Sequence, residues 1–259
     1  MSDRRILSYI TKKMNKSVII IPSRLEAKRL PNKPLLKINN IPMIIHVMER
    51  AKESGIANVI VATPDKEILD LVEKNSGKVI LTSKNHSTGT DRVYEALQKL
   101  SNDEINIIIN LQGDMPNLDP NNIKLLDSLM RKSKCGIGTL ATKIQNKEDL
   151  KNTNIVKVET FEYLNYSNFL KTKDFFRKTI SVNTKNIYHH VGIYAFTKNV
   201  LSKYVKLNRT KNEIERKLEQ MRALDNNIDI NVALSKSYPL GVDTEEDFLS
   251  IKKSMEYKS

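Results

Sequence analysis

Cysteine is almost missing from this 259-residue sequence, since Cys135 is the only one. A single thiol excludes an intramolecular disulfide and a zinc site built from several thiolates of one chain. Tryptophan is absent, and 8 glycines and 8 prolines are too few for a linker, so the composition is that of a globular protein. No apolar run is long enough to span a bilayer, which argues against membrane insertion.

The N-terminus is basic and lacks both a sustained apolar core and a small-residue cleavage site. It is therefore not expected to act as a secretory signal. Together with the lone cysteine, this favours a cytoplasmic protein in which residues 1–15 form a basic tail.

The charge is strongly positive, with 43 Lys and Arg against 30 Asp and Glu and a formal net charge of +13. These cations are spread over many predicted helix faces, tryptophan is absent, and no stripe of aromatic residues among clustered cations appears. A nucleic-acid-binding module would be expected to show clustered cations with aromatic residues among them. The charge alone thus identifies no partner, and we expect no nucleic acid.

Short apolar runs alternate with helical patterns in the first half of the chain. Residues 17–21, 59–62, 78–81 and 105–111 are typical of buried strands, and 41–54, 66–75 and 90–100 have helical spacing. This alternation predicts an α/β fold with a mostly parallel sheet covered on both faces. The loops after its strands then share one edge, where ligands of such sheets bind.

The second half is less regular. We expect strands at 137–142, 155–159, 191–196 and 228–234, a helix at 213–224 with Ile214, Leu218 and Met221 inward, and a closing helix at 244–254. Thr244 is a plausible cap of that last helix. No internal repeat or linker is evident, so residues 16–259 are interpreted as one domain.

A basic loop follows the first strand. Residues 22–35 hold four cations (Arg24, Lys28, Arg29 and Lys33) and three prolines that stiffen the chain. Arg and Lys neutralise phosphate oxygens well, so the loop could bind a triphosphate, although a solvated basic loop has the same composition. It lacks the glycine spacing of the Walker and dinucleotide motifs.

Two carboxylates are candidate magnesium ligands. Asp114 comes directly after the apolar strand 105–111, and Asp243 comes before the closing helix. Magnesium prefers one or two protein carboxylates together with phosphate oxygens and water. Taken alone, Asp114 could also be a turn residue and Asp243 a helix-start residue.

Five blocks together resemble the 3-deoxy-manno-octulosonate (KDO) cytidylyltransferase family. They are residues 22–35, His86-Ser87-Thr88-Gly89-Thr90-Asp91-Arg92, Gln112-Gly113-Asp114, His190-Val191-Gly192-Ile193-Tyr194-Ala195-Phe196, and Leu218-Glu219-Gln220-Met221-Arg222 with Gly241-Val242-Asp243-Thr244. The resemblance covers about Ser17 to Phe248. The first and third blocks occur broadly in sugar nucleotidyltransferases, whereas the other three are more particular to this family.

The resemblance implies a three-layer αβα, Rossmann-like nucleotidyltransferase that makes CMP-KDO and pyrophosphate from CTP and KDO, for lipopolysaccharide biosynthesis. It implies catalytic roles for Arg24, Lys33 and Asp114, with Mg²⁺ on Asp114 and Asp243. Nucleotide contacts are implied for Pro22, Arg24, Lys33, Ser87, Gly89, Thr90 and Arg92, and sugar contacts for Gln112, His190, Tyr194, Glu219 and Gln220. Arg92 could instead lie near the sugar carboxylate. A homodimer is also implied, with residues 160–195 as a sugar-side or dimer region.

Three positions depart from the family pattern. Met115 stands where the family usually has Glu, Ala27 where Ser is common, and Asn168 where an arginine is expected. These changes leave open a cytidylyltransferase for another ulosonic acid, such as sialic acid. They also leave open a non-catalytic relative that acts as an interaction protein.

Overall fold

The computed structural model describes residues 16–26, 29–178, 185–238 and 240–256. They form two compact units: the first holds the described residues of 1–124 and 239–259, and the second spans Leu125–Tyr238. The predicted tail lies outside the described residues, and the single domain stays a prediction, because compact units of one chain can still fold together. Within the described ranges, no helix is both long and apolar enough to cross a membrane.

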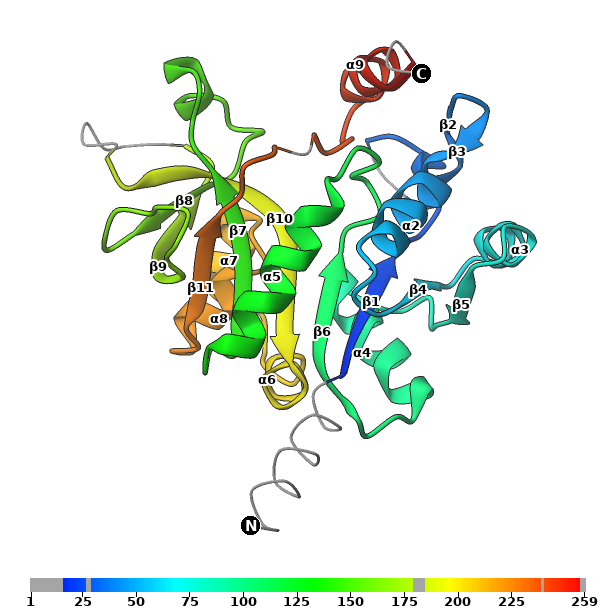
Figure 1. The fold of residues 1–259 in the computed structure, drawn as a ribbon, viewed down its shortest axis with the longest axis horizontal. Helices are drawn as coiled ribbons and strands as arrows, with labels where there is room; N and C mark the ends of the chain where they lie inside the picture. Colours follow the sequence, from blue (N-terminus) through cyan, green and yellow to red (C-terminus); the bar gives the residue numbers. More distant parts are fainter. Residues whose placement is uncertain (1–15, 27–28, 179–184, 239, 257–259) are drawn as a thin grey trace, which may run out of the picture. The chain divides into compact units, whose positions relative to one another are not determined.

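The first unit is built on a parallel sheet with strand order β5-β4-β1-β6 (Figure 1). The strands are β1 (Lys16–Pro22), β4 (Asn58–Thr63), β5 (Lys78–Leu81) and β6 (Ile105–Leu111). Val18 to Ile21 of β1 are fully or almost fully buried, as expected for a β-branched run covered on both faces. Every strand and helix predicted for this half is present, with ends that differ by no more than two residues.

Helices cover both faces of this sheet. They are α2 (Met43–Glu53), α3 (Lys66–Lys74) and α4 (Gly89–Leu100). The chain moves from β1 outward to β4 and β5 through α2 and α3, then returns across the sheet to β6 through α4. Because such crossovers are right-handed, α2 and α3 lie on one face and α4 lies on the other. The predicted three layers therefore hold for the first unit.

The C-terminal segment belongs to the first unit as well. Helix α9 (Glu245–Glu256) begins at a capping box, in which Thr244 Oγ1 accepts from Asp247 N–H and Asp247 accepts from Thr244 N–H. Its Ile251 packs with Ile38, Met43 and Val242 in a small apolar cluster. The predicted Thr244 cap is confirmed, and the cluster fixes Val242 and its neighbour Asp243 within this unit.

Smaller elements complete the chain. In the first unit they are η1 (Lys33–Leu35), β2 (Lys37–Ile38) and β3 (Ile41–Pro42), and α5 (Pro120–Lys132) leads into the second unit. The second unit also holds η2 (Lys147–Leu150), α6 (Lys198–Tyr204), α7 (Lys211–Arg216) and α8 (Met221–Asp225).

The second unit has a mixed sheet rather than a parallel one. Its strands are β7 (Ile137–Thr142), β8 (Lys157–Thr160), β9 (Leu170–Phe176), β10 (Ile187–Thr197) and β11 (Ile230–Leu234). Pairing runs in the order β10-β7-β11-β9-β8, and β8 also pairs with β10. Only the β7–β11 pairing among these is parallel. The prediction of a mostly parallel sheet is therefore correct for the first unit alone.

The predicted helix at 213–224 is wrong as a single element. α7 ends at Arg216, the next residue Lys217 has a left-handed backbone (φ 54°), and α8 starts only at Met221. Ile214, predicted to face inward, is 54% exposed, whereas Glu213 is buried in an ion pair with Arg222. Leu218 and Met221 are buried as predicted, but hydrophobic spacing missed Glu213, because a buried ion pair shares the inner face with these apolar residues.

Candidate functional site

A pocket lies at the carboxyl ends of β1 and β6 in the first unit. The residues that line it come from the first loop, the start of α4 and the end of β6: Pro22, Ser23, Arg24, Glu26, Lys33, Pro34, Thr88, Gly89, Arg92, Gln112, Gly113 and Asp114. A Cβ added to Gly113 would come within 3.2 Å of the Pro22 carbonyl oxygen, so glycine permits the close approach of these two strand ends. Three blocks far apart in the sequence thus meet at one sheet edge.

Oxygen atoms gather around Lys33 beside this pocket. Its Nζ lies 2.9 Å from Asp114 Oδ2, 2.8 Å from the Val242 carbonyl oxygen and 3.7 Å from Asp243 Oδ1. Arg29 also pairs with Asp243, at 3.0 Å. A backbone hydrogen bond from Val242 N–H to the Asp114 carbonyl ties the two carboxylate-bearing segments together.

These oxygens fit a hard divalent cation. Asp114 and Asp243 both approach one ammonium group, so their carboxylates are close enough to share a cation. Among the described residues, no group of three or more His, Cys, Asp and Glu side chains could hold a metal. Two carboxylates with open positions suit Mg²⁺, which takes its other ligands from phosphates and water.

Arg24 and Arg92 add positive charge to the pocket, which they both line. Arg92 is only 3% exposed, and its Nη1 donates to Thr82 Oγ1 (2.6 Å) and to the Ser83 carbonyl (3.0 Å). Burial, and next the charge of Arg24, lower the pKa of Arg92, so the two guanidiniums are close enough to interact. Two like charges in one pocket favour an anionic ligand.

Two predicted nucleotide contacts lie elsewhere. Ser87 is exposed and Thr90 is buried, and neither is among the described residues that line the pocket. Thr90 Oγ1 accepts from Asn110 Nδ2 (3.2 Å), and Asn110 Oδ1 accepts from Gln112 Nε2 (3.3 Å). Thr90 therefore has a structural partner, and contacts of Ser87 and Thr90 with a nucleotide stay predictions.

A β-bulge brings two predicted sugar contacts together in the second unit. The register of β10 against β7 shifts between Val191 and Tyr194. Four residues of regular strand would separate two side chains by about 13 Å. The rings of His190 and Tyr194 are instead 5.3 Å apart between centroids, because the extra residues of the bulge turn both side chains toward each other.

The protonation of His190 follows from its surroundings. Burial, and next the neighbouring His189, lower the pKa of His190 to about 3, so the ring is neutral at neutral pH. Thr139 Oγ1 donates to the Ile193 carbonyl (2.7 Å) and lies 2.9 Å from His190 Nε2. Because the hydroxyl proton is used on the carbonyl, Nε2 must carry the ring proton, which leaves Nδ1 as an acceptor.

Glu219 and Gln220 lie between α7 and α8. Tyr204 Oη donates to the Glu219 carbonyl (2.8 Å) and lies 3.4 Å from its Oε1. Burial, and next the charge of Glu219, raise the pKa of Tyr194 well above its ordinary value, so Glu219 and Tyr194 are neighbours. Tyr194 Oη is buried without a hydrogen-bond partner among the described residues. His190, Tyr194 and Glu219 are thus brought into one group.

Several residues that line or support these groups escape sequence reasoning. Ser23 lines the pocket, and its buried Oγ has no hydrogen-bond partner in the described part of the chain. Thr88 also lines the pocket, and Asn110 holds Gln112. Ser23 and Thr88 stand inside blocks that the family resemblance singles out, whereas nothing in the apolar pattern of 105–111 marks Asn110 as different from a core position.

The departures from the family pattern have local explanations. Met115 is 4% exposed and contributes to the apolar core. Asn168 accepts from Asn165 N–H (3.0 Å) and donates to the Tyr163 carbonyl (3.0 Å), so it stabilises a turn. Ala27 lies outside the described residues. Neither described departure removes a residue from the pocket or from the carboxylate pair.

Comparisons with known proteins agree with this arrangement. A family profile described as cytidylyltransferase matches residues 18–230. A 3-deoxy-manno-octulosonate cytidylyltransferase of Paramagnetospirillum magneticum is 38% identical over 231 residues, 89% of this chain and 94% of the relative. A protein of the same description from Brucella canis is 38% identical over 233 residues, 90% of this chain and 92% of the relative.

Solved structures give the same result. The structure of CMP:2-keto-3-deoxy-manno-octonic acid synthetase complexed with CTP has a TM-score of 0.84 and 34% identity, and the match covers 95% of this chain and 100% of that one. A cytidylyltransferase from Leptospira borgpetersenii, at 21% identity and a TM-score of 0.63, shares the fold. The chain therefore belongs to the cytidylyltransferase family, among the 3-deoxy-manno-octulosonate cytidylyltransferases.

Proposed function

We propose that this protein transfers CMP from CTP to KDO and releases pyrophosphate. The observation that carries the proposal is the pocket of the first unit, where Arg24, Lys33 and Arg92 lie beside the Asp114 and Asp243 carboxylates. Cations for a triphosphate and carboxylates for a metal stand at one sheet edge, as phosphoryl-transfer chemistry requires. The names of the relatives supply the identities of the nucleotide and the sugar acid.

In the proposed reaction the anomeric hydroxyl oxygen of KDO attacks the α-phosphorus of CTP in line. A bond forms between that oxygen and phosphorus, and the bond to the pyrophosphate oxygen breaks. Both reactants are anions, so neutralising charge is the first requirement. Arg24 and Lys33 are assigned to the triphosphate, with Pro22, Gly89 and Arg92 as further nucleotide contacts, and Ser87 and Thr90 as candidates that lie outside the described pocket.

Asp114 and Asp243 are the proposed Mg²⁺ ligands. A bound Mg²⁺ would screen the phosphates and lower the pKa of the attacking hydroxyl, so no dedicated side-chain base is required. Lys33 Nζ contacts both carboxylates, so it lies beside the residues that would hold the metal.

The sugar acid is assigned to Gln112, His190, Tyr194, Glu219 and Gln220. A neutral imidazole whose Nδ1 is an acceptor suits a hydrogen bond from a sugar hydroxyl better than proton abstraction, because a pKa of about 3 makes a weak base. The unpartnered Tyr194 hydroxyl is a second group that a polyhydroxylated ligand could satisfy.

We further propose that the protein is cytoplasmic, acts in lipopolysaccharide biosynthesis and forms a homodimer. The dimer proposal rests on the aromatic segment of the second unit, where Phe161, Tyr163 and Tyr166 are all more than half exposed. Aromatic side chains are enriched at protein interfaces. Light scattering of the purified protein measures the oligomeric state directly.

The experiment that tests the enzymatic proposal is pyrophosphate release with CTP, Mg²⁺ and a panel of sugar acids that includes KDO and sialic acid. We expect release with KDO, and release that depends on added Mg²⁺. Release with another ulosonic acid but not with KDO would show that the acceptor is wrong, while the transfer of CMP would stand. No release with any sugar acid would contradict the function.

A further inference from the structure

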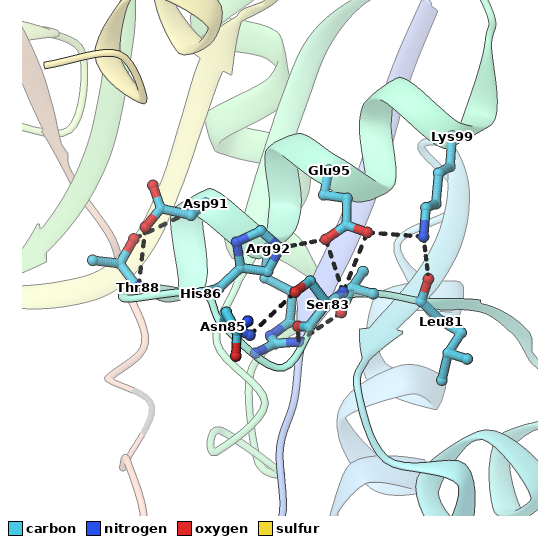
Figure 2. Close-up of polar contacts among 10 residues, drawn as sticks. Leu81, Ser83, Asn85, His86, Thr88, Asp91, Arg92, Glu95 and Lys99 are labelled. Atoms are coloured by element: carbon cyan, nitrogen blue, oxygen red, sulfur yellow. Dashed lines mark hydrogen bonds and ion pairs between the residues drawn. The ribbon is translucent and has the colours of Figure 1, made fainter.

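Glu95 is the centre of a polar network on α4 that the proposed reaction does not use (Figure 2). Its carboxylate accepts hydrogen bonds from the Ser83 N–H (2.9 and 3.2 Å), from Lys99 Nζ (2.8 Å) and from the ring of His86. Lys99 Nζ also donates to the Leu81 carbonyl (2.8 Å). Glu95 thus binds the connection between β5 and α4 at two points, Ser83 and His86.

The same connection holds Arg92 in the nucleotide pocket. Arg92 lies one turn before Glu95 on α4, and its Nη1 donates to the Ser83 carbonyl and to Thr82 Oγ1. Ser83 therefore binds Glu95 through its N–H and Arg92 through its carbonyl oxygen. A displacement of Ser83 would move the guanidinium that lines the pocket.

The far end of the connection also reaches the pocket. It finishes at Thr88 and Gly89, both of which line the pocket. Thr88 and Asp91 form a capping box at the start of α4, with bonds of 3.1 and 3.2 Å. Because His86 lies two residues before Thr88, its contact with Glu95 restrains the chain that enters the cap.

Glu95 remains ionised in this network. Burial opposes its charge, but the bonds from Lys99, the Ser83 N–H and His86 outweigh burial and lower the pKa of Glu95 to about 2. Its charge in turn raises the pKa of Arg92, although burial and Arg24 act in the opposite direction and prevail. Glu95 and the pocket are therefore linked electrostatically as well as through the chain.

We propose that Glu95 is a positioning residue for the nucleotide, which holds Arg92, Thr88 and Gly89 in the geometry that binds CTP. The inference rests on the proposed function, since it takes CTP as the ligand of this pocket. Glu95 itself is not among the residues that line the pocket, so it acts through Ser83 and His86.

Electrostatics alone predicts the opposite effect of removing Glu95. The loss of a negative charge near a cationic pocket would strengthen the binding of an anionic triphosphate. The loss of a positioning contact would weaken it, because Arg92 would no longer be held in place. The direction of the change in CTP affinity therefore separates the two roles.

The first experiment measures the Kd of CTP without any sugar acid, by calorimetric titration of wild type, Glu95→Met and Glu49→Met. Glu49 is an exposed helix residue paired with Lys52 on α2, so its variant makes the same change of charge away from the pocket. We expect Glu95→Met to raise the Kd about tenfold and Glu49→Met to leave it within about twofold. The kcat at saturating CTP and the KM of KDO should stay near wild type.

A second pair of variants covers the case in which Glu95→Met does not fold. His86→Ala removes the ring that contacts Glu95, and His86→Gln returns a donor at a similar reach. We expect His86→Ala to raise the Kd of CTP severalfold and His86→Gln to restore most of the affinity. Equal affinities in these two variants, or unchanged or tighter binding by folded Glu95→Met, would overturn the positioning role. Absence of CTP binding by the wild type would contradict the proposed function itself.

Discussion

The two compact units hold their polar groups in opposite ways. In the first unit, the cations Arg24, Lys33 and Arg92 and the carboxylate of Asp114 line an open pocket at the ends of parallel strands. In the second, His190 and Tyr194 lie among aromatic rings on a bulged strand of a mixed sheet. The pocket of the first unit keeps its groups charged, whereas the His190–Tyr194 group of the second unit is kept neutral.

Burial explains the suppression. It is the largest cause of the pKa shifts of His189, His190, Tyr194 and Tyr204, and each shift favours the neutral form. Neutral hydroxyl and imidazole groups recognise the hydroxyls of a ligand through hydrogen bonds, whereas phosphoryl transfer needs fixed charges. We therefore expect changes of charge in the pocket of the first unit to affect turnover. Changes of hydrogen bonding around His190 and Tyr194 in the second unit should affect acceptor binding and stability.

The largest expected effect is that of Asp114→Asn. The variant keeps the fold, because Asp114 lies at a strand end outside the core, but it loses a metal ligand and should lower kcat by about a thousandfold or more. Pyrophosphate release at saturating CTP, KDO and Mg²⁺ measures this. Asp70→Asn, on the exposed face of α3, is the control with the same change of charge. Wild-type rates in Asp114→Asn would show that Asp114 does not bind the metal.

Glu213→Gln tests a second difference between the units, which is the burial of an ion pair in the second unit. Glu213 is 1% exposed and pairs with Arg222 (2.7 Å) and Arg209 (2.9 Å), so removing its charge takes away the ion-pair partner of the buried Arg222. We expect a loss of about 3 kcal/mol in the free energy of unfolding, measured by urea titration. Glu49→Gln breaks an exposed pair of the first unit and should cost less than about 1 kcal/mol. Equal losses in the two variants would remove this difference between the units.

The parallel sheet of the first unit could be predicted from the sequence because its strands and helices have distinct hydrophobic patterns. Strands buried on both faces appear as continuous apolar runs, such as 17–21 and 105–111, and the helices between them have one apolar face. In the second unit the strands predicted at 137–142, 155–159, 191–196 and 228–234 are present as β7, β8, β10 and β11, but β9 and the strand pairings could not be predicted in this way. Its pairings are mostly between strands distant in sequence, and its inner positions include ions such as Glu213, which periodicity assigns to solvent.

The candidate site shows the same division. Arg24, Lys33 and Asp114 follow directly from strand ends, because parallel strands share a carboxyl edge. Asp243 could not be paired with Asp114 by pattern, since a carbonyl contact of Lys33 and the packing of Val242 bring it there. The sugar group depended on resemblance, because the bulge that brings His190 to Tyr194 has no signature in hydrophobic spacing. Glu95 was missed because it lies on the polar side of the predicted helix at 90–100, where a glutamate is ordinary, although the structure leaves its side chain only 20% exposed.

The pH dependence of stability tests the burial of the two neutral histidines in the second unit. The pKa values of His189 and His190 are lowered to about 4 and about 3, below the ordinary 6.5. Between these values and 6.5 the unfolded chain binds more protons at these two imidazoles, so their contribution to stability rises with pH in this window and is constant above it. We expect at least about 2 kcal/mol to be lost between pH 6.5 and pH 4.5, measured by urea unfolding. His189→Gln should reduce the slope, and an unchanged slope would contradict the burial of this imidazole.

The smallest expected effect concerns single hydroxyl groups within the second unit. Tyr194 Oη is buried without a partner among the described residues, whereas Tyr204 Oη donates to Glu219. A buried hydroxyl without a partner destabilises the free protein, so Tyr194→Phe should raise the free energy of unfolding by about 1 kcal/mol. Tyr204→Phe loses a hydrogen bond and should lower it by about the same amount.

The value of kcat/KM for KDO distinguishes a hydroxyl of Tyr194 that binds the sugar acid from one that is purely structural. If the hydroxyl binds KDO, Tyr194→Phe should lower kcat/KM for KDO about tenfold while the Kd of CTP is unchanged. The variant would then be more stable and less active, as expected where a binding group is left unsatisfied until the ligand arrives. A more stable variant with full kcat/KM would instead make Tyr194 a purely structural residue. In that case acceptor recognition would depend on His190 and Glu219 without it.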